Sequence, residues 1–434
     1  MPLSHLYRHA HGCNASFPAV LSATTSVLNQ VDMTAPSSDW LKFIVWTALL
    51  NDKRADLSPR FEPGGWMQWP DNEDYSLQFM RVLGSAQEGG STISECFLTA
   101  SHIAAGDDES WYRAWKSIAD SNKTRGDLAL EAGNVHSALS NWLRASNYYR
   151  TSEIFLKLDD HRRADALERM RACSYLVVAH QPSGGELVRI PCFEGGFVEA
   201  YFLRAPGAES RTPVVVCVGG SDHLKDEHLH TLLRQAHSRG LSLLLADLPG
   251  QGSAPRIKGG MVRYEVETAI SCCVDYLIAR GDIDERRIAI FGGGLGAAYA
   301  SRAARLDDRF AAAVCDAGIW DMHQRVTATL WMPGDGGQDT IGDEIRRLKR
   351  HGGVTSIKCP ILMTFGEHDW LDIRHADALC EALKDEGADV TLKVFAATET
   401  AAAHGQSDNP TIGNEFVFDW IATRLARARV PADA

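Results

Sequence analysis

The sequence predicts an α/β fold in which an all-helical unit precedes a mostly parallel sheet that is covered by helices on both faces. The chain has 434 residues, of which 45% are hydrophobic, so it can bury a large core and exceeds one typical domain. Apolar residues recur at helical spacing up to about residue 178, and strand patterns alternate with helices after the turn residues 182–185. We expect an N-terminal arm and helical cap in residues 1–180 and a core in residues 181–434.

The helical unit shows start signals and an aromatic face. Residues 1 to about 30 have no clear period and are expected to form an arm. Serines or aspartates suited to an N-cap open the segments SSDWLKFIVWTALL and DDESWYRAWKSIAD. Further on, one helix face carries Ala138, Trp142, Ala145 and Tyr149. The ordinary interpretation of these aromatics is packing between helices, and the alternative is that some of them line a pocket.

In the core, strands alternate with helices, which indicates a parallel sheet. The expected strands are ELVRIPC, FVEAYFL, TPVVVCVGG, LSLLLADL, RIAIFGG, AAAVCDA, CPILMTFG and VTLKVF. Helices are expected near 262–280, from 295, near 373–386 and near 412–428. Residues 320–356 are too many for a simple connection and predict a lid or helical insertion.

Composition and charge narrow the function classes. The formal net charge of −12 leaves no basic face for a phosphate backbone, so a small-molecule ligand is expected rather than nucleic acid, and a homodimer is left open. The ten cysteines lack the C-x-x-C spacing of metal sites and are expected to be buried free thiols, and we expect neither a metal nor a cofactor. Neither a signal peptide nor an uninterrupted apolar span is recognisable, so a cytoplasmic protein without a membrane partner is expected.

A glycine cluster within RIAIFGGGLGAAYASRAA, residues 287–304, has two interpretations. As a dinucleotide fingerprint it reads G-x-G-x-x-A from Gly292, and Asp316 would then bind a ribose hydroxyl. As an α/β-hydrolase nucleophile elbow, G-x-S-x-G, it runs from Gly292 to Gly296 with Gly294 in the serine position. Because about five strands come before it, whereas a dinucleotide fingerprint opens at the first strand, the cofactor interpretation is the remote alternative.

Other strand ends carry groups that suit a hydrolase. Asp369 follows ILMTF in the segment GEHD, and His404 lies in the final long loop, AATETAAAHGQSDNP. Elbow, acid and histidine in this chain order are typical of α/β hydrolases. The backbone N–H groups of Gly220 and Ser221, together with that of Leu295 just after the elbow, would form an oxyanion hole.

The chain resembles the α/β hydrolases that carry an N-terminal helical cap. The resemblance extends from about residue 70 to 430 and rests on the segments WYRAW, AGNVHSA, LRASNYYR, GGSDHLKDE, DLPGQGSA, GEHD and HGQSDN. That group includes the yellowish-green-type hydrolases that shorten fungal heptaketides, 2,6-dihydroxypseudooxynicotine hydrolase and the fermentation/respiration switch protein. The resemblance implies an α/β-hydrolase fold and cleavage of a carbon–carbon or acyl bond beside a ketone, in β-diketone or aromatic polyketide substrates.

By position, the resemblance implies that Asp369 and His404 are the acid and the base. It also implies that Gly219 to Ser221 form the oxyanion region, and that Asp222 lies where some members place an additional acidic catalytic residue. The three side chains also have simpler interpretations. Asp369 and Asp222 could cap helices, and His404 could be an ordinary surface residue. The departure from the family is Gly294, because glycine offers no nucleophile and losing a triad serine costs about a millionfold in rate.

Three hypotheses follow. In the first, the chain is an enzyme for a keto substrate in which His404, oriented by Asp369, moves protons while the oxyanion hole stabilises an enolate, as in a lyase, cyclase, isomerase or water-activating hydrolase. The second is a non-catalytic binding protein on a hydrolase scaffold. The third is an ordinary serine hydrolase whose serine was replaced by glycine. Retention of His404 and Asp369 favours the first, and we expect both to face Gly294 beneath the helical cap.

Overall fold

The computed structural model describes residues 68–428, apart from 158, 194–195, 209, 221–222, 249–250, 252–265, 319–356, 372 and 386. The predicted arm, the first predicted helix at 37–50 and the predicted insertion at 320–356 lie outside the described residues.

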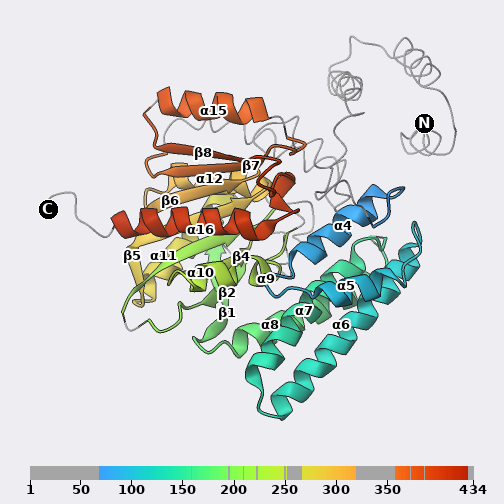
Figure 1. The fold of residues 1–434 in the computed structure, drawn as a ribbon. Helices are drawn as coiled ribbons and strands as arrows, with labels where there is room; N and C mark the ends of the chain where they lie inside the picture. Colours follow the sequence, from blue (N-terminus) through green and yellow to red (C-terminus); the bar gives the residue numbers. More distant parts are fainter. Residues whose placement is uncertain are drawn as a thin grey trace, which may run out of the picture. The chain divides into compact units, whose positions relative to one another are not determined.

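The first described elements are five helices, which we call the helical cap. They are α4 (Glu73–Gly84), α5 (Ile93–Ala100), α6 (Asp108–Glu131), α7 (Val135–Glu153) and α8 (His161–Ala179), shown in blue to green in Figure 1. Side-chain caps start most of them: the carboxylate of Asp107 accepts from the N–H of Glu109 at the start of α6, as its sequence predicts. Each cap satisfies a backbone donor that the helix itself leaves free.

Aromatic side chains form the core of the cap. Trp111, Trp115, Trp142 and Tyr148 are almost completely buried. The indole N–H of Trp111 donates to the carbonyl of Thr151 at 2.8 Å, and that of Trp142 donates to an aspartate of α6. The buried indole nitrogen of Trp115 has no hydrogen-bond partner among the described residues. These aromatics therefore pack between helices, as the ordinary interpretation predicts.

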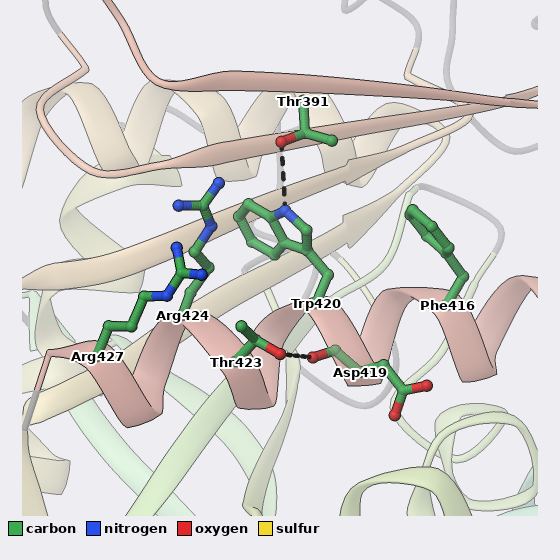
Figure 2. Close-up of a pocket in the computed structure, with 7 residues that line it drawn as sticks. All are labelled: Thr391, Phe416, Asp419, Trp420, Thr423, Arg424 and Arg427. Carbon is green, nitrogen blue, oxygen red and sulfur yellow. Dashed lines mark hydrogen bonds between the residues drawn. The ribbon is translucent and has the colours of Figure 1, made fainter.

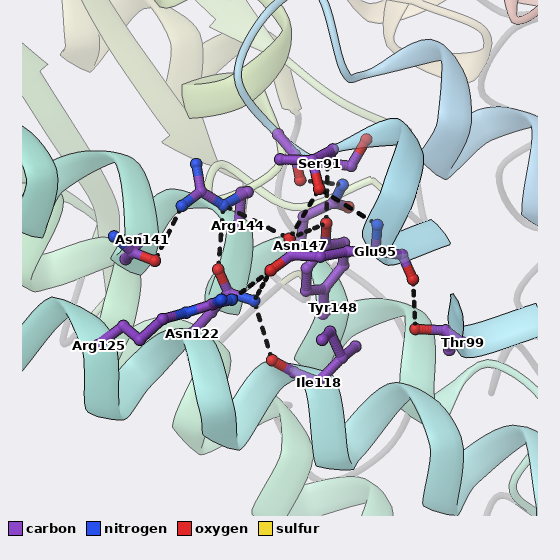
Figure 3. A network of polar contacts seen from close by, with 12 residues as sticks. Ser91, Glu95, Thr99, Ile118, Asn122, Arg125, Asn141, Arg144, Asn147 and Tyr148 are labelled. Carbon is purple, nitrogen blue, oxygen red and sulfur yellow. Dashed lines mark hydrogen bonds and ion pairs between the residues drawn. The ribbon is translucent and has the colours of Figure 1, made fainter. Parts of the chain in front are cut away.

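A partly buried carboxylate connects three helices of the cap (Figure 3). Glu95 of α5 accepts hydrogen bonds from Asn122 of α6 at 3.0 Å and from the hydroxyl of Tyr148 of α7 at 2.9 Å, and it pairs with Arg125. Burial opposes ionisation, but the bonds from Asn122, Arg125 and Tyr148 lower the pKa of Glu95 below its usual value. An ionised Glu95 thus fixes the relative positions of these helices.

The rest of the described chain forms an eight-stranded sheet in the order β1-β2-β4-β3-β5-β6-β7-β8. The strands are β1 (Gly185–Phe193), β2 (Gly196–Leu203), β3 (Thr212–Val218), β4 (Ser242–Asp247), β5 (Ile283–Gly293), β6 (Phe310–Asp316), β7 (Ile361–Gly366) and β8 (Val390–Phe395). β2 pairs antiparallel with β1 and with β4, and all the other neighbours are parallel. The predicted α/β class is confirmed, whereas the division into domains at residues 180 and 181 stays a prediction.

Helices cover both faces of the sheet, as Figure 1 shows for α15 and α16. One face packs against α11 (Val266–Ala279), α12 (Leu295–Leu306) and α15 (Ile373–Asp385). The other packs against α9 (His228–Thr231), α10 (Leu233–His237) and α16 (Pro410–Arg427). In β3, Val214 and Val216 pack on the face covered by α11, α12 and α15, whereas Val215 and Cys217 pack on the face covered by α9, α10 and α16. Burial on both faces explains why this strand is a continuous apolar run.

Three further expectations concern thiols, metals and membranes. The nine cysteines within the described ranges are free thiols, and burial raises the pKa of Cys217 and Cys315, which disfavours the reactive thiolate. The same ranges contain no group of three His, Cys, Asp or Glu side chains that could hold a metal ion. None of the helices described above is long and apolar enough to cross a bilayer.

Candidate active site

The predicted elbow is a tight turn between β5 and α12. Gly294, at its tip, has φ 55° and ψ −118°, a left-handed backbone that residues with side chains rarely adopt. Its N–H donates to the carbonyl of Asp316 at the end of β6, at 2.8 Å. Sharply turned, strained backbone at a strand-to-helix junction is the geometry of a nucleophile elbow.

The glycines of the elbow differ in what surrounds them. A Cβ on Gly292 would lie 2.1 Å from the carbonyl oxygen of Gly296, and one on Gly296 would lie 2.5 Å from that of Val218, so both positions require glycine. A Cβ on Gly294 would meet no atom within 4 Å. The turn therefore excludes side chains on both sides of Gly294 while leaving room for one at its tip.

His404 and Asp369 form the pair that the sequence predicts. Nδ1 of His404 lies 2.9 Å from Oδ1 and 3.1 Å from Oδ2 of Asp369. Asp369 follows β7 and its side chain is 2% exposed, whereas His404, at the start of the 3₁₀ helix η2 (His404–Gln406), is 23% exposed. The N–H of Leu371 holds Oδ1 of Asp369 at 2.9 Å. The carboxylate thus fixes the ring so that Nε2 is available as the proton acceptor.

Asp316 is a second carboxylate near this histidine. It lies at the end of β6, and its Oδ1 accepts from the hydroxyl of Thr364 in β7 at 2.7 Å. Burial raises the pKa of Asp316, although the bond from Thr364 opposes this. The dinucleotide interpretation assigned Asp316 to a ribose, but the structure joins it to the elbow through its backbone and to the histidine through its charge.

The two carboxylates decide the protonation of His404. Burial alone would lower the pKa of His404, but the charge and hydrogen bond of Asp369, with a further contribution from Asp316, raise the pKa above its usual value. Because the pKa of His404 is higher in the folded than in the unfolded chain, the pair with Asp369 stabilises the folded state. This stabilisation is complete at a pH below about 6.5, the pKa of an unfolded histidine, and is lost as the pH rises through the pKa of His404 in the folded state.

We expect the Asp369→Asn substitution to lower the pKa of His404, because it removes the charge that favours the imidazolium. NMR titration of the His404 ring in the full chain measures this directly. Asp389→Asn is the matched control, because Asp389 is half exposed and pairs with Arg424 at 2.9 Å, away from His404. A His404 pKa that is unchanged by Asp369→Asn would contradict the assignment, as would an equal change in the control.

The predicted oxyanion loop follows β3, the strand beside β5. A Cβ on Gly219 would lie 2.3 Å from the carbonyl oxygen of His223, so the loop doubles back tightly. The side-chain amide of Gln251 donates to the carbonyls of Gly219, at 3.1 Å, and of Gly220. Its oxygen accepts from the N–H of Leu248 at 2.8 Å. Gln251, which sequence reasoning did not single out, therefore anchors the loop.

Leu295 is the first residue of α12, where backbone N–H groups have no acceptor within the helix. Because β3 and β5 are parallel neighbours, Leu295 after β5 lies at the same edge of the sheet as Gly220 after β3. The loop after β3 packs against the start of α12, since a Cβ on Gly296 would lie 3.0 Å from the carbonyl carbon of Gly219. Ser221 and Asp222 lie outside the described residues. The role of these residues as an oxyanion hole stays a prediction.

A buried lysine holds the end of this loop to the sheet. Nζ of Lys225 lies 2.8 Å from Oδ2 of Asp247, 3.1 Å from Glu199 and 3.6 Å from Asp226, and its side chain is completely buried. Tyr201 donates to Asp226 at 2.9 Å. Burial alone would lower the pKa of Lys225, but the surrounding carboxylates raise it, so the lysine stays charged. Sequence reasoning missed this cluster.

Two hollows in the surface lie at different distances along the chain from the His404–Asp369 pair. One lies between the cap and the core, and it is lined by residues that include Arg81, Asn147, Arg150, His223, His230 and Gly405. Gly405 directly follows His404, so this cavity adjoins the candidate site, and we call it the cap cavity. The other lies between α16 and β8, where Trp420 donates to Thr391 at 3.3 Å (Figure 2). Neither hollow is lined by His404 or Asp369 itself, but of the two only the cap cavity includes residues next to His404 in the chain, so it is the better candidate for a substrate site.

Comparison with known families decides the relationship. The model of the esterase FrsA-like family matches residues 107–331, just over half of the chain. The chain belongs to the FrsA-like esterase family. The model of the prolyl oligopeptidase family, another group of α/β hydrolases, matches residues 255–427. Membership of an α/β-hydrolase family agrees with the elbow interpretation of the glycine cluster rather than with the dinucleotide fingerprint.

Several curated fungal proteins are similar to this FrsA-like chain. Hydrolyase poxO of Penicillium oxalicum is 32% identical over 263 residues, which are 58% of this chain and 62% of that protein. Hydrolase acrC of Aspergillus aculeatus is 34% identical over 56% of this chain and 61% of that protein. The 20-hydroxy-prefusarin hydrolase of Gibberella moniliformis is 28% identical over 68% of this chain and 73% of that protein. The match thus spans about three-fifths of the first two relatives.

Solved structures confirm the fold expected of an FrsA-like chain. The crystal structure of 2,6-dihydroxy-pseudo-oxynicotine hydrolase matches with a TM-score of 0.67 at 20% identity, covering 81% of this chain and 98% of that one. AbyA5 matches with a TM-score of 0.56 at 17% identity, covering 82% of this chain and all of that one. The α/β-hydrolase fold with helices before the sheet, predicted from the sequence, is thereby confirmed.

Proposed function

We propose that this FrsA-like chain is an enzyme that cleaves a carbon–carbon or acyl bond beside a ketone, in a β-diketone or polyketide-like small molecule, without a covalent intermediate. The observation that carries the proposal is the intact His404–Asp369 pair, 2.9 Å apart, in a chain whose elbow has glycine at its tip. A hydrogen-bonded histidine with an available Nε2 can move protons without a nucleophilic side chain. The printed name of the Gibberella relative, a 20-hydroxy-prefusarin hydrolase, supports the substrate class.

In the proposed reaction, Nε2 of His404 takes a proton from a water molecule as the water oxygen forms a bond to the substrate carbonyl carbon. The carbonyl π electrons move to the oxygen, and the N–H groups of Gly220 and Leu295 stabilise that oxyanion. When the carbonyl re-forms, the bond to the neighbouring carbon breaks and its electron pair leaves as an enolate. The His404 imidazolium, stabilised by Asp369, returns the proton to the enolate carbon.

The same residues support related proton transfers. Removal of a proton from the carbon between two ketones needs only His404 and a stabilised enolate, so cyclase, lyase or isomerase chemistry uses the same site. The glycine at 294 also fits a second function, a binding protein without turnover. A serine hydrolase whose serine was replaced would share this geometry, and the products formed from a ketone substrate distinguish these functions.

We expect the full chain to convert members of a panel of β-diketones and aryl ketones, with products identified by mass spectrometry. His404→Gln should reduce product formation by about 10²- to 10⁴-fold, the usual contribution of a general base. His161→Gln is the matched control, because the His161 side chain is 92% exposed at the start of α8.

Each outcome of this experiment separates the functions. Saturable binding without any product would overturn the enzyme proposal in favour of the binding protein. Product formation that is unaffected by His404→Gln would overturn the assigned base. Conversion that needs His404 but releases no cleavage fragments would identify cyclase or isomerase chemistry.

A further inference from the structure

Among the described residues that line the cap cavity, Arg81 carries a positive charge that forms neither a hydrogen bond nor an ion pair, although this charge acts on the nearby Glu227. Arg81 of α4 lines the cavity and is partly buried. Other charged residues of the lining are paired: Glu88 accepts from Arg234 at 2.7 Å and from Gln235 at 2.9 Å, and Arg150 bonds Glu227 at 3.2 Å. For Arg81, the described part of the chain supplies neither an ion pair nor a hydrogen bond.

Two histidine rings line the same cavity. His230 is 7% exposed, and both of its ring nitrogens lack a hydrogen-bond partner among the described residues. Burial lowers the pKa of His230 to about 4, so the ring is neutral at physiological pH and has one N–H to donate. Nε2 of His223 is likewise without a partner there. The cavity therefore presents a cation and unused polar ring atoms, while Glu88 and Glu227 are already paired.

The position of Arg81 connects this cation to the reacting group. Gly405 and Ser407, on either side of Gln406, line the cavity with Arg81, and His404 immediately precedes Gly405. The positive charge of Arg81 acts on His404 and partly opposes the effect of Asp369 on the histidine. A ligand that bonds Arg81 would therefore extend toward the proton acceptor of the candidate site.

We propose that Arg81 binds an anionic oxygen of the substrate, so that the enzyme selects acidic keto compounds, which carry a carboxylate or an ionised enol or phenol. This inference rests on the proposed function, because it places the substrate in the cap cavity beside His404. A guanidinium forms two parallel hydrogen bonds to a carboxylate or to a chelating diketonate, which fixes the orientation of the carbonyl as well as its position.

The test measures binding, not turnover, by isothermal titration calorimetry on the full chain. The probes are benzoylacetate, its uncharged methyl ester, and 1-phenylbutane-1,3-dione measured below and above its own pKa. Wild-type protein should bind benzoylacetate or the ionised diketone more tightly than the ester. Arg81→Gln should weaken binding of the anion by about 10- to 100-fold, the usual range for a charged hydrogen bond, and leave the ester unchanged.

Two variants control for structure and charge. Arg81→Lys keeps the charge but loses the paired geometry, so it should restore only part of the affinity. Arg113→Gln removes an arginine of α6 whose side chain is 68% exposed, and it should change no affinity. Thermal unfolding of each variant verifies that the fold is retained.

The results separate the two possible anions. Preference for benzoylacetate alone identifies a carboxylate, and tighter binding of the diketone only above its pKa identifies an enolate. Equal or undetectable binding of anion and ester by the wild type overturns the inference, as does an equal loss for both in Arg81→Gln. Failure of the proposed function gives a different result. In that case the wild-type chain still binds the anion more tightly than the ester, but it forms no product.

Discussion

Gly294→Ser is expected to become covalently labelled by a fluorophosphonate and to hydrolyse p-nitrophenyl acetate, while the wild-type chain does neither. The new side chain has room, because a Cβ at this position meets no atom within 4 Å. The backbone already has the elbow conformation, and His404 with Asp369 supplies the base. Holding a serine at φ 55° costs about 1–3 kcal/mol of stability, which a chain of this size tolerates.

Two controls make this result specific. Adding His404→Ala to Gly294→Ser should abolish the labelling, because the hydroxyl then lacks its base. Gly207→Ser is matched in backbone strain, since Gly207 has φ 65° and open space around its Cβ, but it lies in the turn between β2 and β3. It should lose similar stability and gain no label. A folded Gly294→Ser protein without labelling or esterase activity would show that Gly294 and His404 do not share a site.

Lys225→Met is expected to cost about 3–5 kcal/mol in the free energy of unfolding, because it removes the cation that the buried carboxylates of Asp247 and Asp226 face. Urea denaturation measures the loss. Lys384→Met is the matched control, since Lys384 is 48% exposed and its pair with Glu381 is worth less than about 1 kcal/mol.

A second substitution tests the cause of that loss. Asp247→Asn removes the negative charge nearest to Lys225, so the double variant should lose less stability than the sum of the two single variants. Strictly additive losses would mean that the lysine acts through packing of its chain and not through its charge.

The parts of the molecule that the sequence predicts are those whose cause is local. Continuous apolar runs such as that of β3 follow from burial on both faces of a parallel sheet, and His404 and Asp369 were found because catalytic groups gather after strand ends. Their pairing at 2.9 Å agrees with the expected chain order. Each of these signals lies within one element and its adjoining loop.

The missed residues depend on contacts between distant segments. The partners of Lys225 come from β2 and β4, so no spacing in the sequence identifies the cluster. Gln251 becomes informative only when the carbonyls of Gly219 and Gly220 are seen beside it. Arg81 stands out because none of the residues that the structure describes bonds its guanidinium, and no pattern in the sequence indicates this.

The left-handed backbone of Gly294 has an evolutionary consequence. Serine and glycine codons of the types AGC and GGC differ in a single base, and the tip of the turn leaves room for a serine side chain, although the φ of 55° would strain it. Under the proposed function, one base change at this position would exchange non-covalent for covalent catalysis while the flanking glycines stay in place. Glycine at this position avoids that strain, because it adopts positive φ without steric cost.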